Sequence, residues 1–251
     1  MKLDSTAAII TGGASGLGEA TARYFASQGA QVTLLDRDAA RGESVAKEIG
    51  GHFVMTDVTD ETSVQKAVDH AQEKMGWITA AVNCAGIALG IKTTGRDGPH
   101  PLDAFQRTVD INLVGSFNVA RLAAVAMAKN TPEDDGARGV IINTASIAAF
   151  DGQKGQAAYA ASKGGIVGMT LPMARDLAKD GIRVMTIAPG IFKTPMLAGL
   201  PEEVQADLAK DVPNPPRLGD PSEYGRLAGF IVEMGYLNGE VIRLDGALRM
   251  R

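Results

Sequence analysis

Cysteine and histidine are scarce in this chain of 251 residues. Cys84 is the single cysteine, which excludes an intramolecular disulfide and suits a reducing compartment. We expect Cys84 to be a small buried residue rather than a nucleophile. The three histidines, His52, His70 and His100, are scattered without the spacing of metal ligands, so we expect no metal site.

An excess of positive charge is also missing. The formal net charge is −4 and the pI is near 5.4, which gives no general attraction to phosphate backbones, so we expect no nucleic-acid partner. No apolar stretch reaches the roughly 18 residues of a membrane-spanning helix, and no signal or transit segment opens the chain. We therefore expect a cytoplasmic enzyme without a membrane partner; the alternative location is the mitochondrial matrix.

Short apolar runs are present and alternate regularly with helical patterns. The composition, 45% hydrophobic and 22% charged, is enough for a buried core, and no repeat or composition break marks a second domain within residues 1–251. The runs expected to be strands are Ala7–Thr11, Gln31–Asp36, His52–Met55, Ala80–Asn83, Val140–Thr144, Arg183–Ala188 and Glu240–Leu244. Most are continuously hydrophobic, as in strands that are covered on both faces.

The segments between these runs have helical periodicity. In the first helical segment, the residues that would share one face of the helix are Leu17, Ala20, Thr21, Tyr24 and Phe25. Gly29 is expected to end this helix. Repeated strand–helix units of this kind predict an α/β Rossmann fold, which is a doubly wound parallel sheet of about seven strands with helices on both faces.

Two segments interrupt this rhythm, at 90–101 and 189–217. The first is rich in Gly and Pro, and the second contains six prolines around a short amphipathic piece, Glu202–Lys210. Ligands of open α/β sheets bind at the carboxyl ends of the strands, so loops in these places are candidate walls of a substrate cleft. Surface insertions without a function are the alternative.

A glycine-rich turn, T-G-G-A-S-G-L-G, runs from Thr11 to Gly18, directly after the first strand and at the start of the first helix. Its glycines allow a tight turn and let backbone N–H groups approach a diphosphate at the positive end of the helix dipole. Asp36, at the end of the second strand, can accept hydrogen bonds from ribose hydroxyls and repel a 2′-phosphate. NAD is therefore favoured over NADP, although Arg37 weakens that preference.

Asp57 and Val58 end the third strand, where they can contact the adenine through its exocyclic amine and an apolar face. Taken alone, Asp57 is equally compatible with a cap for the helix that follows.

Tyr159 and Lys163 lie four residues apart in Y-A-A-S-K, and Ser146 precedes them. Residues at this spacing share one face of a helix. Lowering the pKa of a phenol by about three units needs roughly 4 kcal/mol, which one cation about 4 Å away can supply at an effective dielectric near 20. A positively charged nicotinamide nearby would add to this effect. The pair is therefore a candidate acid/base group, although this spacing also arises often by chance.

The chain resembles the short-chain dehydrogenase/reductase family over nearly its full length. The motifs that carry the resemblance, in order, are the glycine-rich turn, Asp57-Val58, Asn83-Cys84-Ala85-Gly86, Asn112, Ser146, Tyr159-Ala160-Ala161-Ser162-Lys163 and Pro189-Gly190 followed by Thr194. Cys84 is the one departure, because the family often has Asn or Ala there; we expect little effect behind the cofactor.

The resemblance implies a role for each matching residue. Tyr159 would exchange a proton with the substrate oxygen, Ser146 would hydrogen-bond to that oxygen, Lys163 would lower the Tyr159 pKa and bind ribose, and Asn112 would help carry the proton outward. The implied NAD-binding set is Gly12, Ser15, Gly16, Leu17, Gly18, Asp36, Asp57, Val58, Cys84, Ala85, Gly86, Tyr159, Lys163, Pro189, Ile191, Phe192 and Thr194. The substrate would contact Ser146, Tyr159 and Gln156.

Three of these residues have a simpler alternative interpretation. Asn112 is compatible with a cap or a hydrogen bond within a helix, Ser146 with a turn, and Thr194 with a local turn bond before Pro195.

Longer segments, including G-V-I-I-N-T-A-S and N-G-E-V-I-R-L-D-G-A, look like a subgroup of the family, the type-2 3-hydroxyacyl-CoA dehydrogenases. They imply NAD-dependent oxidation of an (S)-3-hydroxyacyl-CoA to the 3-ketoacyl-CoA.

Other functions stay open at this stage. A 3-ketoacyl-acyl-carrier-protein reductase normally prefers NADPH, against which Asp36 argues; a hydroxysteroid or simple alcohol dehydrogenase and a structural or binding role are further alternatives.

The helix after Tyr159 contains Gly164, Gly165 and Gly168, which cost stability unless a neighbouring helix packs closely on them. Family members commonly pair this helix in oligomers, and we expect a homotetramer.

Overall fold

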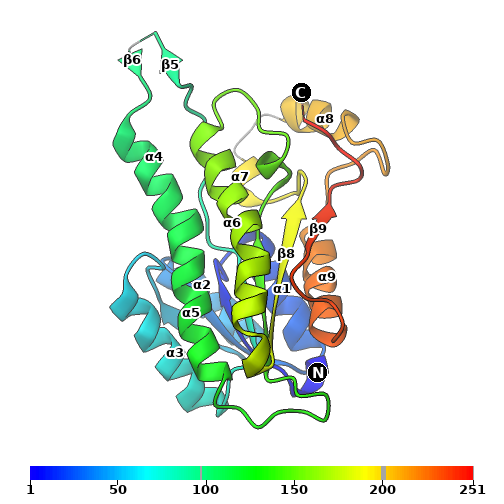
Figure 1. Ribbon diagram of the computed structural model, residues 1–251. Helices are drawn as coiled ribbons and strands as arrows, with labels where there is room; N and C mark the ends of the chain where they lie inside the picture. Colours follow the sequence, from blue (N-terminus) through cyan, green and yellow to red (C-terminus); the bar gives the residue numbers. More distant parts are fainter. Residues whose placement is uncertain (97, 199–201, 251) are drawn as a thin grey trace.

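A parallel sheet of seven strands, in the order β3-β2-β1-β4-β7-β8-β9, forms the centre of the fold (Figure 1). The computed structural model describes residues 1–96, 98–198 and 202–250. The strands of the sheet are β1 Ala7–Thr11, β2 Gln31–Asp36, β3 His52–Met55, β4 Ala80–Asn83, β7 Gly139–Thr144, β8 Ile182–Pro189 and β9 Val241–Leu244. The fold class expected from the sequence is thus confirmed.

The seven apolar runs correspond to these seven strands with small differences at the ends. β7 begins one residue early, β8 extends by one residue at each end, and β9 begins one residue late. Strand pairing crosses large distances in the chain: in β1, Ile10 pairs with Leu34 of β2 on one side and with Val82 of β4 on the other. An antiparallel hairpin of β5 Thr94–Gly95 and β6 Gly98–Pro99 was not predicted.

Helices connect the strands and cover both faces of the sheet. They are α1 Gly16–Ser27, α2 Ala39–Ile49, α3 Glu61–Met75, α4 Leu102–Val109, α5 Gly115–Met127, α6 Ala157–Asp176, α7 Pro195–Ala198, α8 Glu202–Lys210 and α9 Pro221–Glu233. Short 3-10 turns lie at Leu3–Ser5, Ile147–Ala149 and Ala178–Asp180, and a π-helical turn at Asp110–Val114 joins α4 to α5. Gly29 has a φ of 91°, as expected for the stop after α1.

Alternate residues of each central strand enter two separate hydrophobic layers. Ile9 of β1 packs among residues of α3 and α5, while Ile10 packs among residues of α1 and α9; both side chains are fully buried. This two-sided burial explains why the strands are nearly continuous apolar runs.

The strand order reverses between β1 and β4. The crossovers from β1 lead outward to β2 and β3, whereas those from β4 lead the opposite way to β7, β8 and β9. The loops after β1 and β4 therefore diverge and leave a crevice at the carboxyl ends of the strands, which is where such sheets bind ligands.

The prediction that no segment is long and apolar enough to cross a membrane was wrong. The continuous helical stretch Leu102–Met127 has a mean hydropathy of 1.3 over its most apolar window. Half of that window is buried, and residues such as Val119, Ala123 and Met127 lie fully inside the layer beneath the sheet. The buried half of the window is thus apolar because it packs in the core.

The two interrupting segments lie at the same end of the molecule. The β5–β6 hairpin extends beyond α4, and α7 and α8 follow the carboxyl end of β8 (Figure 1). The amphipathic piece Glu202–Lys210 forms α8 with the expected bounds. Of the predicted cleft walls, residue 97 in the first segment and residues 199–201 in the second lie outside the described residues.

Candidate active site

A cleft of about 400 Å³ opens at the carboxyl ends of β1, β2, β4 and β7. It brings together most of the predicted site residues, from the glycine-rich turn to α6. The predicted residues that line it are Gly12, Ser15, Gly16, Leu17, Gly18, Asp36, Asp57, Val58, Cys84, Ala85, Gly86, Ser146, Tyr159, Lys163, Pro189, Phe192 and Thr194.

Two glycines of the turn are required by close backbone contacts. A Cβ on Gly18 would lie 2.2 Å from the carbonyl oxygen of Gly12. Gly12 itself has a φ of 65°, and a Cβ there would lie 2.9 Å from the backbone of Cys84 and Ala85. A side chain at either position would displace neighbouring backbone atoms. The turn, which forms the floor of the cleft, would then have to change its conformation.

Helix α1 begins in this turn without a side-chain cap. Its N-cap residue, Ser15, makes no side-chain hydrogen bond to the helix, whereas α2, α3 and α9 are capped by Asp38, Asp60 and Asp220. The first N–H groups of α1 point toward the cleft end of the helix with their dipoles aligned, which suits an anionic group such as a diphosphate.

Asp36 lies at the end of β2 and is tied to the backbone through both carboxylate oxygens. Oδ2 accepts from the N–H of Ala14 at 3.0 Å, and Oδ1 accepts from the N–H of Asp38 at 3.1 Å. The carboxylate therefore lines the cleft and also holds the glycine-rich turn.

Asp57 is held in a local turn. Its Oδ1 accepts from the backbone N–H and the hydroxyl of Thr59, at 3.0 and 2.7 Å, and these bonds lower its pKa. Helix α3 is capped instead by Asp60, which accepts from the N–H of Thr62. The alternative that Asp57 caps the following helix was wrong.

Ser146 and Tyr159 meet at the other end of the cleft. Ser146 follows β7, is 8% exposed, and accepts from the N–H of Ala148, so it also forms the turn that was its alternative interpretation. Its side chain is hydrogen-bonded to the Tyr159 hydroxyl. Burial raises the pKa of the Tyr159 phenol, and the bond to Ser146 opposes that rise only in part.

Lys163 lies on the same face of α6 as Tyr159, as the spacing predicted. Its Nζ is 5.8 Å from the centre of the Tyr159 ring and donates to the carbonyl oxygen of Thr144 at 2.7 Å. The side chain is 5% exposed, and burial lowers the pKa of its amine to about 8.

The expected direction of the Tyr159 pKa was wrong for the protein's own groups. The sequence argument counted the charge of Lys163, with a nicotinamide cation as an addition, and left out the desolvation of the phenol, which dominates and raises the pKa. A lowered pKa would need a further positive charge in the cleft.

Cys84 belongs to a buried hydrogen-bonded chain. Its Sγ lies 3.8 Å from the Tyr224 hydroxyl, which in turn lies 2.7 Å from Oγ1 of Thr144. Oγ1 of Thr144 donates to the carbonyl oxygen of Asn83 at 2.5 Å. Burial raises the pKa of the Cys84 thiol, which makes it a poor nucleophile.

Asn112 is not among the residues that line the cleft. It is fully buried in the π-helical turn, where its Nδ2 donates to the carbonyl oxygen of Ile87 and to Oγ of Ser162, and its Oδ1 accepts from the N–H of Ile87. The side chain thus connects the loop after β4 to α6, behind Lys163. Its part in carrying a proton stays a prediction.

Two further predicted residues lie apart from the cleft. The side-chain oxygen of Gln156 accepts from the N–H of Gln153 in its own loop. Ile191 packs with Ile147 and Val212 and lines a separate, smaller pocket. Thr194 does line the cleft, and its carbonyl oxygen accepts from the N–H of Leu197, so the alternative of a local turn also applies.

Sequence reasoning missed several residues of the cleft. Arg107 of α4 and Ile111 of the π-helical turn reach it, and Leu35, Arg37, Thr56, Ile87, Thr144, Ala145, Gly190 and Pro195 complete its walls. The strand ends among them were recognisable because neighbouring positions had been assigned to the site. No sequence pattern pointed to Arg107.

The geometry fits a dinucleotide and a hydroxyl or carbonyl substrate. A floor of glycines and an uncapped helix start lie at one side, the Asp36 carboxylate lies beside them, and a Ser–Tyr–Lys group lies across the cleft. Among the described residues, no group of three or more His, Cys, Asp or Glu side chains is placed to hold a metal ion.

Comparisons with known proteins agree with this arrangement. The family model of short chain dehydrogenases matches residues 6–205. The chain is 59% identical over 248 residues to the 3-hydroxyacyl-CoA dehydrogenase type-2 of Homo sapiens, covering 97% of this chain and 95% of that protein. It is 35% identical to the 3-oxoacyl-[acyl-carrier-protein] reductase of Thermotoga maritima, covering 99% of each. A crystal structure of 3-hydroxyacyl-CoA dehydrogenase type-2 from Mycobacterium avium, 44% identical, superposes with a TM-score of 0.95 and covers 99% of this chain and 98% of that one.

Proposed function

The chain belongs to the short-chain dehydrogenase family, and we propose that within it the protein oxidises (S)-3-hydroxyacyl-CoA thioesters reversibly with NAD. It is an oxidoreductase that uses a nicotinamide cofactor and a small-molecule substrate. The observation that carries the proposal is that Ser146, Tyr159 and Lys163 share one cleft with the glycine-rich turn and Asp36.

The protein's own groups prepare the proton transfer. Tyr159 is the acid or base at the substrate oxygen, and its bond to Ser146 orients the phenol. Lys163, fixed by the carbonyl oxygen of Thr144, holds a positive charge behind the phenol while protonated. The nicotinamide, when bound, accepts or supplies the hydride, and its oxidised ring adds one positive charge.

The raised pKa of Tyr159 supports a direction-dependent use of this group. With the phenol protonated, Tyr159 is ready to act as an acid in reduction. Oxidation needs the phenolate, which the protonated Lys163 would stabilise together with the positive ring of a bound oxidised nicotinamide.

The choice of NAD over NADP rests on Asp36. Its carboxylate lines the cleft beside the glycine-rich turn and carries a negative charge that would oppose a 2′-phosphate. Arg37 lies next to it, 70% exposed, with its Nε 3.8 Å from Asp57.

Replacing Asp36 by Ala is expected to lower kcat/KM for NAD about 100-fold and to raise that for NADP by less than about tenfold. The change removes the repulsion, but it also removes the acceptors for the N–H groups of Ala14 and Asp38. Steady-state kinetics with both cofactors measure the effect. Asp36→Asn, which removes the charge and keeps one acceptor, should retain more NAD activity; equal losses in the two variants would contradict the argument.

The substrate class rests on the relatives. Relatives from several animals carry the name 3-hydroxyacyl-CoA dehydrogenase type-2, at 56 to 59% identity. The reductase of acyl-carrier-protein thioesters is a more distant relative at 35% identity. A hydroxysteroid or simple alcohol is a second candidate, and a structural role without catalysis would leave the assembled Ser146, Tyr159 and Lys163 group unexplained.

A direct assay tests this proposal. The purified protein is mixed with NAD or NADP and with 3-hydroxybutyryl-CoA, longer 3-hydroxyacyl-CoAs, their acyl-carrier-protein thioesters, hydroxysteroids and simple alcohols, and reduced cofactor is followed by absorbance. We expect the highest kcat/KM with NAD and a CoA thioester. Activity on alcohols without any on thioesters would refute the substrate class.

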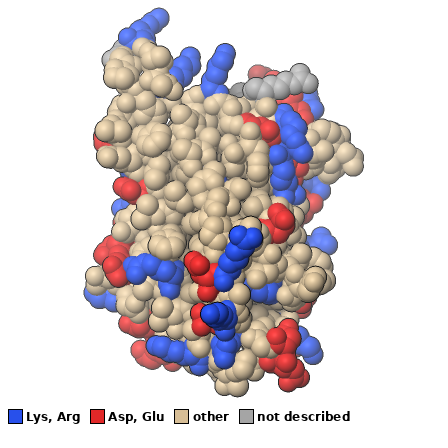
Figure 2. Space-filling view, in the orientation of Figure 1, with Lys and Arg blue, Asp and Glu red and all other residues tan. Residues whose placement is uncertain are grey.

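We also propose that the protein is a homotetramer. We propose the cytoplasm as its location, with the mitochondrial matrix as the alternative. A Cβ added to Gly164 or Gly168 would meet nothing within 4 Å, which leaves room for a second copy on α6, whereas Gly165 packs on Leu113 within the chain. Figure 2 shows a broad uncharged area over α4 and α6. The half-exposed apolar residues of this helical layer include Val114, Phe117, Val125 and Leu171. A monomer in light scattering at micromolar concentration would refute the assembly.

A further inference from the structure

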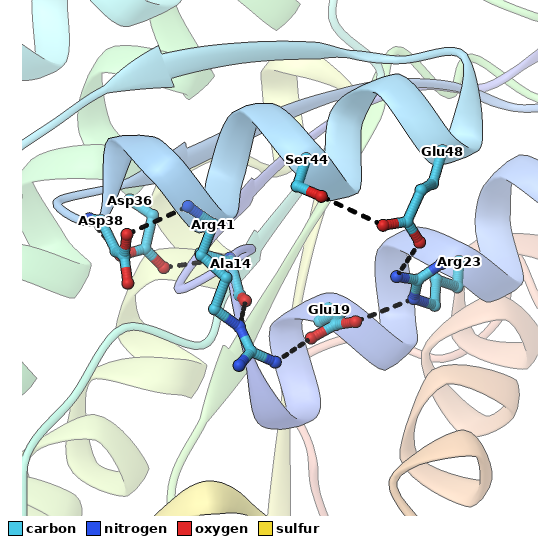
Figure 3. A network of polar contacts seen from close by, with 8 residues as sticks. All are labelled: Ala14, Glu19, Arg23, Asp36, Asp38, Arg41, Ser44 and Glu48. Carbon is cyan, nitrogen blue, oxygen red and sulfur yellow. Dashed lines mark hydrogen bonds and ion pairs between the residues drawn. The ribbon is translucent and has the colours of Figure 1, made fainter.

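A chain of charged side chains from the end of β2, from α2 and from α1 begins at one residue of the glycine-rich turn, Ala14 (Figure 3). Ala14 is 1% exposed, and both of its backbone polar groups are bonded to side chains. Its N–H donates to Oδ2 of Asp36 at 3.0 Å, and its carbonyl oxygen accepts from Nε of Arg41 at 2.6 Å. The two peptide units that flank Ala14 are therefore fixed by the last residue of β2 and by the first turn of α2.

Arg41 is itself fixed at the start of α2. Its backbone N–H donates to Oδ1 of the capping residue Asp38 at 3.1 Å, and its side chain then extends back over the turn (Figure 3). A guanidinium nitrogen donates to Oε2 of Glu19 at 2.9 Å. The planar guanidinium can bond to a carbonyl oxygen and a carboxylate at the same time, which an ammonium cannot reproduce in the same geometry.

Glu19 occupies an unfavourable place for a protein that binds a diphosphate here. It lies in the first turn of α1, the same uncapped helix start that faces the cleft, and its side chain is only 18% exposed. An unpaired carboxylate there would repel an anion at short range. Both of its oxygens are paired with arginines, Oε1 with Nε of Arg23 and Oε2 with Arg41, each at 2.9 Å.

We infer that Arg41 is a positioning residue for the cofactor, a role that rests on the proposed dinucleotide function but not on the choice between NAD and NADP. It holds the carbonyl oxygen of Ala14, so that the peptide that continues into the uncapped start of α1 keeps one orientation. It also neutralises Glu19 beside that helix start. Arg41 is not among the residues that line the cleft, so it acts through the turn.

The outer part of the chain does not explain the arrangement as a stability device. Arg41 and Arg23 have side chains that are 52% and 41% exposed, and Glu48, which pairs with Arg23, is 53% exposed. Exposed ion pairs contribute little to folding. The bond to the buried Ala14 carbonyl is different because it constrains a backbone segment that the ligand must contact.

The first test compares Arg41→Ala with Arg138→Ala. Arg138 is a matched control because its Nε also donates to a backbone carbonyl, that of Asn130 at 3.0 Å, just before the amino end of β7 and away from the cleft. Binding of NADH, followed by its fluorescence, should weaken about tenfold in Arg41→Ala and stay unchanged in Arg138→Ala. With saturating cofactor, kcat and the KM for the 3-hydroxyacyl-CoA substrate should stay within about twofold of the wild-type values in both variants.

Two more variants separate the two tasks. Arg41→Lys keeps the charge beside Glu19 and should restore part of the NADH affinity. Adding Glu19→Gln to Arg41→Ala should also tighten NADH binding relative to Arg41→Ala alone. The second change removes the carboxylate that repels the diphosphate of NADH when Arg41 is absent. No tightening in the double variant would overturn the electrostatic task of Arg41.

The inference as a whole is overturned if Arg41→Ala binds NADH as tightly as Arg138→Ala, or if it lowers kcat while cofactor affinity stays unchanged. Thermal unfolding of each variant shows that the compared proteins are folded. A wild-type protein that binds NADPH but not NADH would refute the choice of NAD, and the same comparison would then be made with NADPH.

Discussion

Replacing Tyr159 by Phe is expected to lower kcat for oxidation and reduction by about a thousandfold, the typical contribution of a well-placed acid or base. The change removes only the hydroxyl, which is bonded to Ser146, and leaves the ring in its place on α6. Initial rates with saturating cofactor and substrate in each direction measure the effect.

Cofactor binding provides the control for this variant. NADH affinity of Tyr159→Phe should stay within a few fold of wild type, because the glycine-rich turn and Asp36 are untouched. Turnover that survives within about tenfold would assign the proton transfer to another group. A loss of NADH affinity equal to the loss of turnover would place Tyr159 in binding rather than in chemistry.

Replacing Lys163 by Met is expected to lower kcat/KM at least about 100-fold and to stabilise the folded protein at neutral pH. The activity is lost because the buried positive charge behind Tyr159 disappears. The stability gain follows from the pKa of the amine, which burial lowers from its ordinary value of 10.5 to about 8.

The pH dependence of that gain has a definite sign. Below about pH 8 the amine is charged in both states, and its burial costs the native protein about 3 kcal/mol, the equivalent of the difference between the two pKa values. Between pH 8 and 10.5 only the unfolded chain binds the proton, so the cost falls as the pH rises. The bond from Nζ to the carbonyl oxygen of Thr144 offsets part of this cost.

Thermal unfolding of wild type and Lys163→Met at pH 7 and near pH 10 measures the difference. We expect Lys163→Met to unfold several degrees higher at pH 7 and the two curves to approach each other at the higher pH. A variant that is less stable than wild type at pH 7 would show that the bond to Thr144 outweighs the desolvation of the amine.

The sheet and the turn were predictable from the sequence because their signals are local. Buried parallel strands are apolar on both faces, so they stand out as continuous apolar runs. The close contacts of Gly12 and Gly18 exclude residues with a side chain, so the turn stands out by its glycines. The amphipathic spacing of Glu202–Lys210 was enough to give α8 its bounds.

Features that depend on tertiary contacts could not be predicted in this way. The pKa of Tyr159 depends on how completely the phenol is desolvated, which no spacing reveals. The choice between Asp57 and Asp60 as the cap of α3 depends on where the chain turns after β3. Arg107 lines the cleft and Arg41 bonds to the glycine-rich turn, each through a long side chain that starts from an element outside the recognised motifs.

The double attachment of Asp36 has a consequence for the history of this cofactor site. A lineage that exchanged this carboxylate to admit a 2′-phosphate would, in the same step, release the loop on which either dinucleotide must rest. An intermediate of that kind would use both cofactors poorly and be selected against. We expect sequences that made the transition to have gained another acceptor for the N–H of Ala14 before they lost the acid.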